Sequence, residues 1–207
     1  IPGIKVDMGA KPLALHSNEK VTGGLDGLSQ RLEEYYNLGA RFAKWRAVIK
    51  IGSGIPSNAC IQANAHALAR YAALCQEASI VPIVEPEVLM DGDHTIETCH
   101  DVSEKSFRSV FEELAIQDIY LEGMVLKPNM VVSGIDCIDQ AGVEEVADRT
   151  VECLKATVPD DVPGCAFLSG GQSSEDATAH LSKMNEKYGD SLPWNLTFSY
   201  GRALQAL

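Results

Sequence analysis

The chain of 207 residues is 45% hydrophobic and 22% charged, which suffices for one sizeable core. Its formal net charge of −12 makes it a poor candidate for binding nucleic acid or an anionic membrane surface. No run of 18 apolar residues and no signal peptide is present. We therefore expect a single domain over 1–207, with neither nucleic acid nor membrane as a partner.

The six cysteines show no disulfide or zinc pattern. None belongs to a Cys-x-x-Cys pair, and none stands at zinc-finger spacing from a second cysteine or a histidine. Most fall at apolar positions of predicted elements, which is typical of free thiols in a reducing compartment. The pattern predicts a cytoplasmic protein. The cysteines are Cys60, Cys75, Cys99, Cys137, Cys153 and Cys165.

Short apolar runs alternate with amphipathic stretches about every 40 residues along the chain. The runs predict strands at 4–7, 42–51, 80–84, 121–127, 165–168 and 196–199. Helical spacing of apolar residues predicts helices at 25–38, 57–75, 99–114, 143–154 and 174–184, and another starting at Ala203. Ser57 is the expected N-cap of the second helix. Strands alternating with helices at this interval predict an α/β fold with a parallel sheet.

Two architectures fit this pattern, an open doubly wound sheet and a (βα)8 TIM barrel. Polar residues stand at or near the carboxyl end of every predicted strand, and in a barrel all of these ends meet at one mouth. The first βα turn also lacks a G-x-G-x-x-G sequence. We therefore expect a barrel of which about six βα units are present here. The N-terminal units and a C-terminal tail are expected to lie outside this chain, since a typical barrel has ~250 residues.

Lys127 ends an apolar run and is followed at once by Pro128. Proline disfavours continuation of the sheet, so we expect the strand to end at the lysine. Burial of an ammonium group is costly and favours the neutral amine, which is the nucleophilic form. Lys127 is thus a candidate for imine formation with a carbonyl substrate. The alternative is that its side chain merely reaches the solvent at the end of the strand.

Further charged residues are expected at the same mouth. Lys44 and Arg46 flank Trp45 in one strand, and Glu85 and Glu87 follow the next. A glutamate or a second lysine within reach of an imine-forming lysine can transfer the protons that imine formation requires. The alternatives are that Glu85-Pro86-Glu87 is a solvated strand exit and that Lys44 and Arg46 form a surface strand face.

The loops after the last two predicted strands indicate an anion site. Glycines leave backbone N–H groups unobstructed, and the second loop precedes a helix start. Loops after strands 7 and 8 are a frequent phosphate site in barrels. The candidate residues are Ser169, Gly170, Gly171, Ser199, Gly201 and Arg202, with Lys5 as a further cation near the mouth.

Other chemistries find little support in the sequence. Asp91-Gly92-Asp93-His94 resembles a metal turn, but no second ligand cluster accompanies it, so we expect no metal. No Ser/His/Asp or Cys/His arrangement is evident. The five histidines fall in predicted loops or helices and are interpreted as surface or packing residues.

Residues 119–129, Ile-Tyr-Leu-Glu-Gly-Met-Val-Leu-Lys-Pro-Asn, resemble the Schiff-base lysine signature of class I fructose-bisphosphate aldolase. Segments 3–7, 42–46, 83–87, 167–173 and 197–204 also resemble that family in the same order, so the similarity spans essentially the whole chain. The resemblance implies that Lys127 forms the imine with the ketose C2 atom. It assigns Glu85 as the main general acid and base, Lys44 as an aid to proton transfer, and Glu87 as support through hydrogen bonding and charge.

The same resemblance implies the substrate and the setting. Ser169, Gly170, Gly171 and Arg202 would bind the phosphate of the dihydroxyacetone phosphate half, and Lys5 and Arg46 would lie toward the other phosphate. The expected reaction is reversible cleavage of fructose 1,6-bisphosphate, without metal or cofactor, in glycolysis and gluconeogenesis. A cytosolic homotetramer is usual. An active-site aspartate, the second barrel strand and a tail with a terminal tyrosine are expected outside this chain.

Two other functions remain open from the sequence. One is a different lysine-imine barrel enzyme, such as a transaldolase or a deoxyribose-phosphate aldolase. The placement of cations in two groups favours a bisphosphate over these. The other is a non-catalytic binding scaffold, since aldolases can bind cytoskeletal proteins.

Overall fold

The computed structural model describes residues 1–205, apart from the side chain of Arg202. Six parallel strands form one sheet in the order β1-β4-β5-β6-β7-β8, so each strand pairs with the next strand of the sheet along the chain. This order is that of a (βα) barrel and not of an open doubly wound sheet. The strands are β1 (Gly3–Lys5), β4 (Phe42–Ile49), β5 (Val81–Val88), β6 (Val125–Leu126), β7 (Gly164–Phe167) and β8 (Asn195–Phe198).

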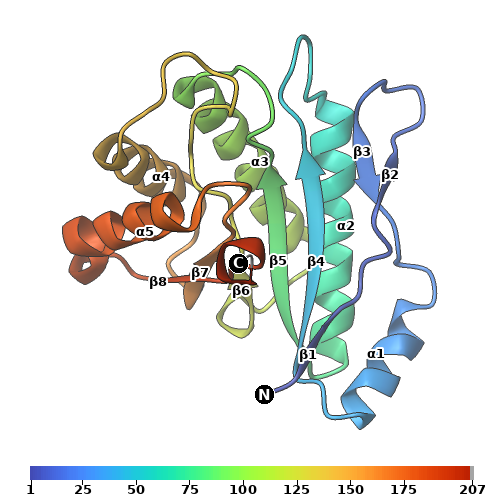
Figure 1. Ribbon diagram of the computed structural model, residues 1–207. Coiled ribbons are helices and arrows are strands. Elements are labelled where there is room, and N and C mark those ends of the chain that lie inside the picture. Colours follow the sequence, from blue (N-terminus) through green and yellow to red (C-terminus); the bar gives the residue numbers. More distant parts are fainter. Residues whose placement is uncertain (206–207) are drawn as a thin grey trace.

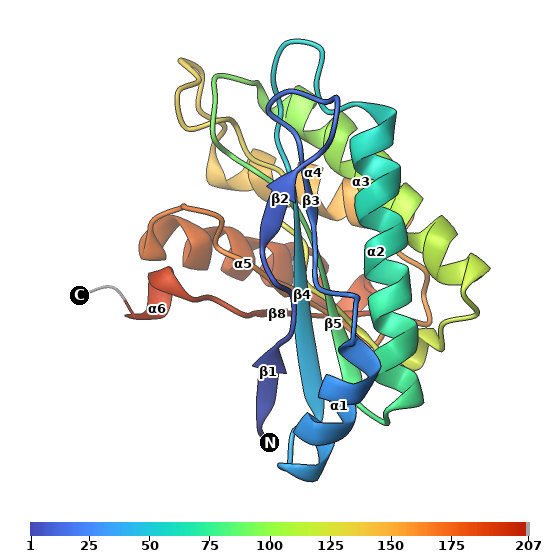
Figure 2. The same ribbon diagram turned by 90° about the vertical axis from the view of Figure 1, so that its right-hand side faces the viewer.

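Helices cover one side of the sheet as a continuous layer in which each helix contacts the next (Figure 1). They are α1 (Leu28–Asn37), α2 (Asn58–Glu77), α3 (Ile96–Ile116), α4 (Val143–Thr157) and α5 (Ser174–Tyr188). The short α6 (Arg202–Gln205) lies apart from α1, α2 and α3, across β4 and β5 (Figure 2). Ser57 caps α2 as predicted, since its hydroxyl oxygen accepts a hydrogen bond from the N–H of Cys60 at 3.1 Å. Within residues 1–205, no helix combines the length and apolarity needed to cross a lipid bilayer.

The sheet turns strongly from one edge to the other. Strands β4 and β5 stand upright in Figure 1, whereas β8 runs nearly across them, and Figure 2 shows the same turn from the side. The edge strands β1 and β8 do not pair with each other within the described residues. A parallel sheet that curves in this way with helices on its outer side is part of a barrel.

Alternation along β4 separates a core face from a mouth face. Ala43 and Trp45 are fully buried, and the Trp45 ring stacks on Tyr71 of α2 with ring centroids 5.6 Å apart. The hydroxyl group of Tyr71 donates a hydrogen bond to the carbonyl oxygen of Ala43 at 2.6 Å. Lys44 and Arg46 alternate with these residues and remain partly exposed on the opposite face. Both cationic side chains thus lie on the mouth face.

Strand β5 is longer than predicted and continues through Glu85-Pro86-Glu87 to Val88. The carbonyl oxygen of Val84 accepts a hydrogen bond from the N–H of Lys127, so the backbone N–H and C=O groups of Val84 face β6. Because these groups alternate in direction along a strand, those of Pro86 and Val88 face the same side. The missing N–H of Pro86 faces β6, so the β5–β6 ladder stops there, while pairing with β4 on the other side continues to Val88. The alternative that this segment is a solvated strand exit does not hold, because Glu85 and Glu87 are both buried.

Two other segments differ from the predictions. The segment 121–127, expected to be a strand throughout, starts with a 3-10 turn at Leu121–Gly123 and contains only the two-residue β6. Gln76 of α2 holds the turn entrance, since its side-chain amide bonds both to the N–H and to the C=O of Tyr120. The predicted loop after β1 contains an antiparallel pair, β2 (Ala10–Pro12) and β3 (Lys20–Thr22), whose short strands carry no apolar period.

Candidate active site

Lys127 and Glu85 lie side by side at the ends of neighbouring strands. The pairing of Val84 with Leu126 extends by one step, because the N–H of Lys127 donates to the carbonyl oxygen of Val84 at 2.8 Å. This register places both side chains on the mouth face, where Lys127 Nζ lies 3.2 Å from Glu85 Oε1. The side chains are 12% and 4% exposed. Such a distance is within reach for proton transfer between the two groups.

Lys44 approaches the same carboxylate from the other side. Its Nζ atom lies 2.7 Å from Glu85 Oε2, and its side chain is 22% exposed. The buried carboxylate is thus ion-paired through each of its oxygens, which offsets the cost of its burial. Two ammonium groups share one carboxylate, so Lys44, Glu85 and Lys127 together carry a formal charge of +1 when all three are ionised. The structure thus brings these three predicted residues together.

Arg46 and Glu87 form a second pair next to this triad. The Nε atom of Arg46 contacts Oε2 of Glu87, which is buried. Burial alone would lower the pKa of Arg46, but the hydrogen bond and charge of Glu87, with smaller effects of Glu85 and Asp7, raise the pKa instead. The alternative that Lys44 and Arg46 form a plain surface strand face does not hold, since both pair with buried glutamates.

Lys5 lies one strand further along the sheet. Its Nζ atom is 2.7 Å from Oδ1 of Asp7, and its side chain is 53% exposed. Asp7 is buried and also accepts a hydrogen bond from the backbone N–H of Arg46 at 3.2 Å. Asp7 therefore links the ammonium group of Lys5 to the backbone of Arg46.

Two polar residues of this region were not among the predicted site residues. Asp7 is the first, and the second is Asn129, which is buried two positions after Lys127. The carboxamide oxygen of Asn129 accepts from the N–H of Val88 at 3.0 Å, and its amide nitrogen donates to the hydroxyl oxygen of Ser103 at 3.0 Å. Both residues stand just after a strand, which was the signal that could have identified them.

The two loops proposed as an anion site follow neighbouring strands. Phe167 pairs with Phe198, and the N–H of Ser199 donates to the carbonyl oxygen of Phe167 at 2.8 Å. Ser169 is buried, while Gly170 and Gly171 adopt φ angles of +64° and +108°, which favour glycine. The structure thus brings the Ser169 loop next to Ser199.

Gly201 lies directly before α6, and its carbonyl oxygen accepts hydrogen bonds from the N–H groups of Leu204 and Gln205. The side chain of Arg202, which the sequence assigns to the phosphate, lies outside the described part of the structure.

Comparisons with known proteins agree on one family. The family model described as fructose-bisphosphate aldolase class-I matches residues 1–207. The chain is 65% identical over 205 residues to the probable fructose-bisphosphate aldolase class 1 of Xanthomonas campestris, which covers 99% of this chain and 61% of that protein. It is 56% identical over 208 residues to fructose-bisphosphate aldolase 1 of Toxoplasma gondii, covering 100% of this chain and 57% of that protein.

A solved structure shows the same fold. The fructose-bisphosphate aldolase from Plasmodium falciparum, crystallised in complex with TRAP and a small molecule inhibitor, superposes with a TM-score of 0.97 at 50% identity. The match covers 100% of this chain and 59% of that chain, so the chain spans about three fifths of its relatives' length. The predicted partial TIM barrel is confirmed, and the chain belongs to the class I fructose-bisphosphate aldolase family.

Proposed function

We propose that the full-length protein reversibly cleaves fructose 1,6-bisphosphate to dihydroxyacetone phosphate and glyceraldehyde 3-phosphate through a Schiff base on Lys127. It would serve glycolysis and gluconeogenesis as a carbon–carbon lyase. The observation that carries the proposal is the Glu85 carboxylate between two lysines, 3.2 Å from Lys127 and 2.7 Å from Lys44. Family membership and 53–65% identity to proteins named as fructose-bisphosphate aldolases support it.

In the proposed mechanism, the neutral amine of Lys127 attacks C2 of the open-chain ketose and forms a carbinolamine. Glu85, which has taken up the proton released when the Lys127 ammonium group becomes the neutral amine, gives that proton to the departing C2 hydroxyl, which leaves as water, and the iminium ion remains. Lys44 assists because its ammonium group contacts the same carboxylate and provides a second proton that can exchange with it. Glu87, paired with Arg46, supports the arrangement by hydrogen bonding and charge.

Cleavage follows from the iminium ion. A base accepts the proton of the C4 hydroxyl, the C3–C4 bond breaks, and its electron pair moves into the iminium group to form an enamine. Glyceraldehyde 3-phosphate leaves first. Protonation of the enamine at C3 and addition of water at C2 release dihydroxyacetone phosphate and restore the Lys127 amine.

Two groups of residues are proposed to hold the phosphates. The turn at Ser169, Gly170 and Gly171 offers backbone N–H groups without Cβ obstruction, and the residues that join it in this role are Ser199, Gly201 and Arg202. Lys5 and Arg46 are proposed for the other phosphate. The Arg46 side chain is 42% exposed, and no described residue hydrogen bonds to its Nη atoms, which leaves them available to a phosphate.

The setting is proposed from the relatives. A relative in Arabidopsis thaliana is named a cytosolic aldolase, and all six cysteines of this chain are free, which supports a cytoplasmic protein. A homotetramer is proposed from the family resemblance. Binding to other proteins is proposed as an additional role, because the Plasmodium falciparum relative was crystallised in complex with TRAP. Cytoskeletal proteins are proposed as such partners from the family resemblance.

The test is reductive trapping of the full-length protein with borohydride and fructose 1,6-bisphosphate, followed by peptide mass mapping. We expect a single adduct on Lys127. Lys127→Met should keep the circular dichroism spectrum and lose both adduct and cleavage, while Lys11→Met, at an exposed position, should retain both. An adduct on another lysine, or appreciable turnover by Lys127→Met, would contradict the proposal.

Two further measurements separate the competing chemistries. Cleavage should persist in EDTA, because the iminium group on Lys127 accepts the electron pair of the C3–C4 bond and no metal ion is needed for this. Loss of cleavage in EDTA would indicate a metal-dependent enzyme. A higher kcat/KM for deoxyribose 5-phosphate than for fructose 1,6-bisphosphate would indicate a different lysine-imine aldolase.

A further inference from the structure

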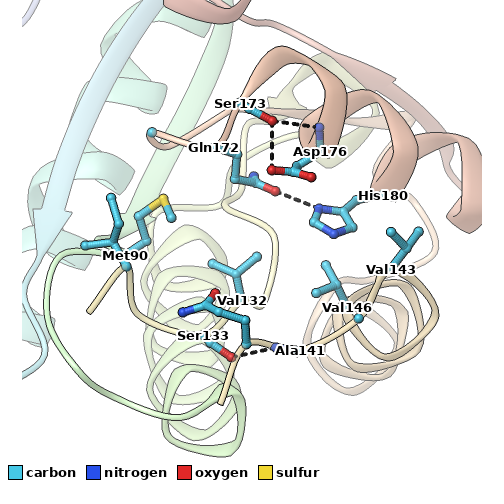
Figure 3. Close-up of a pocket in the computed structure, with 14 residues that line it drawn as sticks. Met90, Val132, Ser133, Ala141, Val143, Val146, Gln172, Ser173, Asp176 and His180 are labelled. Atoms are coloured by element: carbon cyan, nitrogen blue, oxygen red, sulfur yellow. Dashed lines mark hydrogen bonds between the residues drawn. The ribbon is translucent and has the colours of Figure 1, made fainter. Parts of the chain in front are cut away.

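A pocket of about 450 Å³ lies between the loops that follow β6 and β7 (Figure 3). Its apolar side includes Met90, Val132 and Val146. Its polar side includes Gln172, Asp176 and His180. Lys44, Glu85 and Lys127 do not line it, so the pocket is separate from the lysine site, and it meets the proposed phosphate turn only at Gly171. Its volume falls in the range of roughly 300–1,000 Å³ that small-molecule sites occupy.

The orientation of the Gln172 side chain is determined by its contacts. Its Nε2 atom donates to the carbonyl oxygen of Ser169 at 3.0 Å, so its Oε1 atom is the group that faces His180. The distance from Oε1 to Nδ1 of His180 is 2.7 Å. Since Oε1 can only accept a hydrogen bond, Nδ1 must carry the proton of the neutral ring. The Nε2 atom of His180 then presents a lone pair.

That lone pair has no hydrogen-bond partner among residues 1–205, although His180 is only 8% exposed. Burial lowers the pKa of His180, against a smaller opposing effect of Asp176, so the ring is neutral at pH 7. Asp176 itself accepts a hydrogen bond from the hydroxyl group of Ser173 at 2.7 Å. The pocket therefore combines one unsatisfied neutral acceptor with an apolar wall.

We propose that this pocket is a second small-molecule site for neutral, mainly apolar molecules that carry one hydroxyl donor, of which para-alkylphenols are the simplest class. The hydroxyl group donates to Nε2 of His180, and the ring packs against Met90, Val132 and Val146. A small anion is disfavoured, because Asp176 lies on the same wall and the chain carries a net charge of −12. The site does not depend on the proposed aldol cleavage.

The test uses full-length protein labelled with ¹³C at methionine and valine methyl groups. It is titrated with 4-propylphenol and, as the matched probe without a donor, 4-propylanisole. We expect saturable shifts of the Met90, Val132 and Val146 methyl signals, with the phenol binding about 5-fold tighter than the ether, as one hydrogen bond would give. Absence of saturable shifts, or equal affinity of the two probes, would overturn the proposal.

Three variants locate the contact. His180→Leu should bind both probes equally, and a remaining preference for the phenol would contradict the role of Nε2. Gly142→Phe should weaken both probes at least 10-fold. A Cβ at Gly142 meets no atom within 4 Å and its φ is −77°, so the substitution can enter the pocket without straining the backbone. Lys127→Met should bind both probes as the parent does, whereas loss of binding there would move the site to the barrel mouth. Thermal unfolding of each variant controls for folding.

Discussion

The carboxylate of Glu85 lies 3.2 Å from the ammonium nitrogen of Lys127 because β5 and β6 are in parallel register. The pairing of Val84 with Leu126 places the next residue of each strand on the mouth face. A slip of one residue in this register would turn one of the two side chains into the helix layer. The proton-transfer geometry of the site is therefore a property of strand pairing.

Glu85→Gln keeps the shape of the side chain but removes the proton acceptor and the charge between the two lysines. We expect imine formation to slow by roughly 10²–10⁴-fold, the range for loss of one general acid–base group. Rapid quenching with borohydride under single-turnover conditions measures this step directly. The matched control is Glu122→Gln at an exposed position, which should react at the parental rate. An unchanged rate in Glu85→Gln would assign the proton transfers to another group.

The barrel was predictable because each strand carries its own local signal, an apolar run that ends in polar residues. The order of strands in the sheet followed from the βα alternation. What the sequence did not predict was where hydrogen bonding stops. Strand β5 runs past Pro86 because its pairing with β4 continues to Val88 on the side that the missing N–H does not face, and that is a relation between two distant segments. The pairing of β2 with β3 was not predicted because strands of three residues are too short to show an apolar period.

The sequence predicted which residues of the candidate site share the mouth. Their pairing was not predictable, because it depends on the stagger between strands. Lys44 is opposite Ile83 in the β4–β5 register and still reaches Glu85, whereas Arg46 is opposite Glu85 and contacts Glu87. Asn129 was not predicted as a site residue because its partners, Val88 and Ser103, belong to segments that become its neighbours only in the folded chain.

Asn129→Ala removes a buried side chain that joins β5 to the segment after β6 and to α3. It leaves the N–H of Val88 and the hydroxyl group of Ser103 without their partners. Each buried polar group left unsatisfied costs about 1–3 kcal/mol, so for two groups we expect the free energy of unfolding to fall by roughly 2–6 kcal/mol. Urea denaturation measures this change. Asn37→Ala, at an exposed helix position, should stay within about 0.5 kcal/mol of the parent, and an equal loss in both variants would contradict the role assigned to Asn129.

Gly134→Ala tests the close approach of the loops after β5 and β6. A Cβ at Gly134 would lie 2.3 Å from the carbonyl oxygen of Gly92, so the backbone must shift and the hydrogen bond from Gly134 to His94 must weaken. We expect a loss of about 1–3 kcal/mol in the free energy of unfolding, as for overpacked sites. Gly23→Ala is the control, since its Cβ meets no atom within 4 Å. It should lose nothing, and a larger loss there than at Gly134 would refute the steric argument.

Buried thiols should make the protein less stable in alkaline solution. Burial raises the pKa of Cys165 to about 12, whereas an unfolded cysteine has a pKa of about 8.5. Between these values the unfolded state has released a proton that the folded state still holds, so the free energy of unfolding falls as the pH rises. One such group contributes a slope of about 1.4 kcal/mol per pH unit.

Cys165→Ala should therefore reduce the steepness of this decline between pH 9.5 and 11 by about 1.4 kcal/mol per pH unit, measured by urea denaturation at several pH values. Cys75, whose pKa burial also raises to about 12, keeps contributing, so the slope decreases without vanishing. Val162→Ala separates titration from packing, because it truncates a fully buried side chain that has no proton to lose. It should lower the free energy of unfolding equally at every pH. If Cys165→Ala behaves like Val162→Ala, with an unchanged slope, the buried thiol does not carry the alkaline sensitivity.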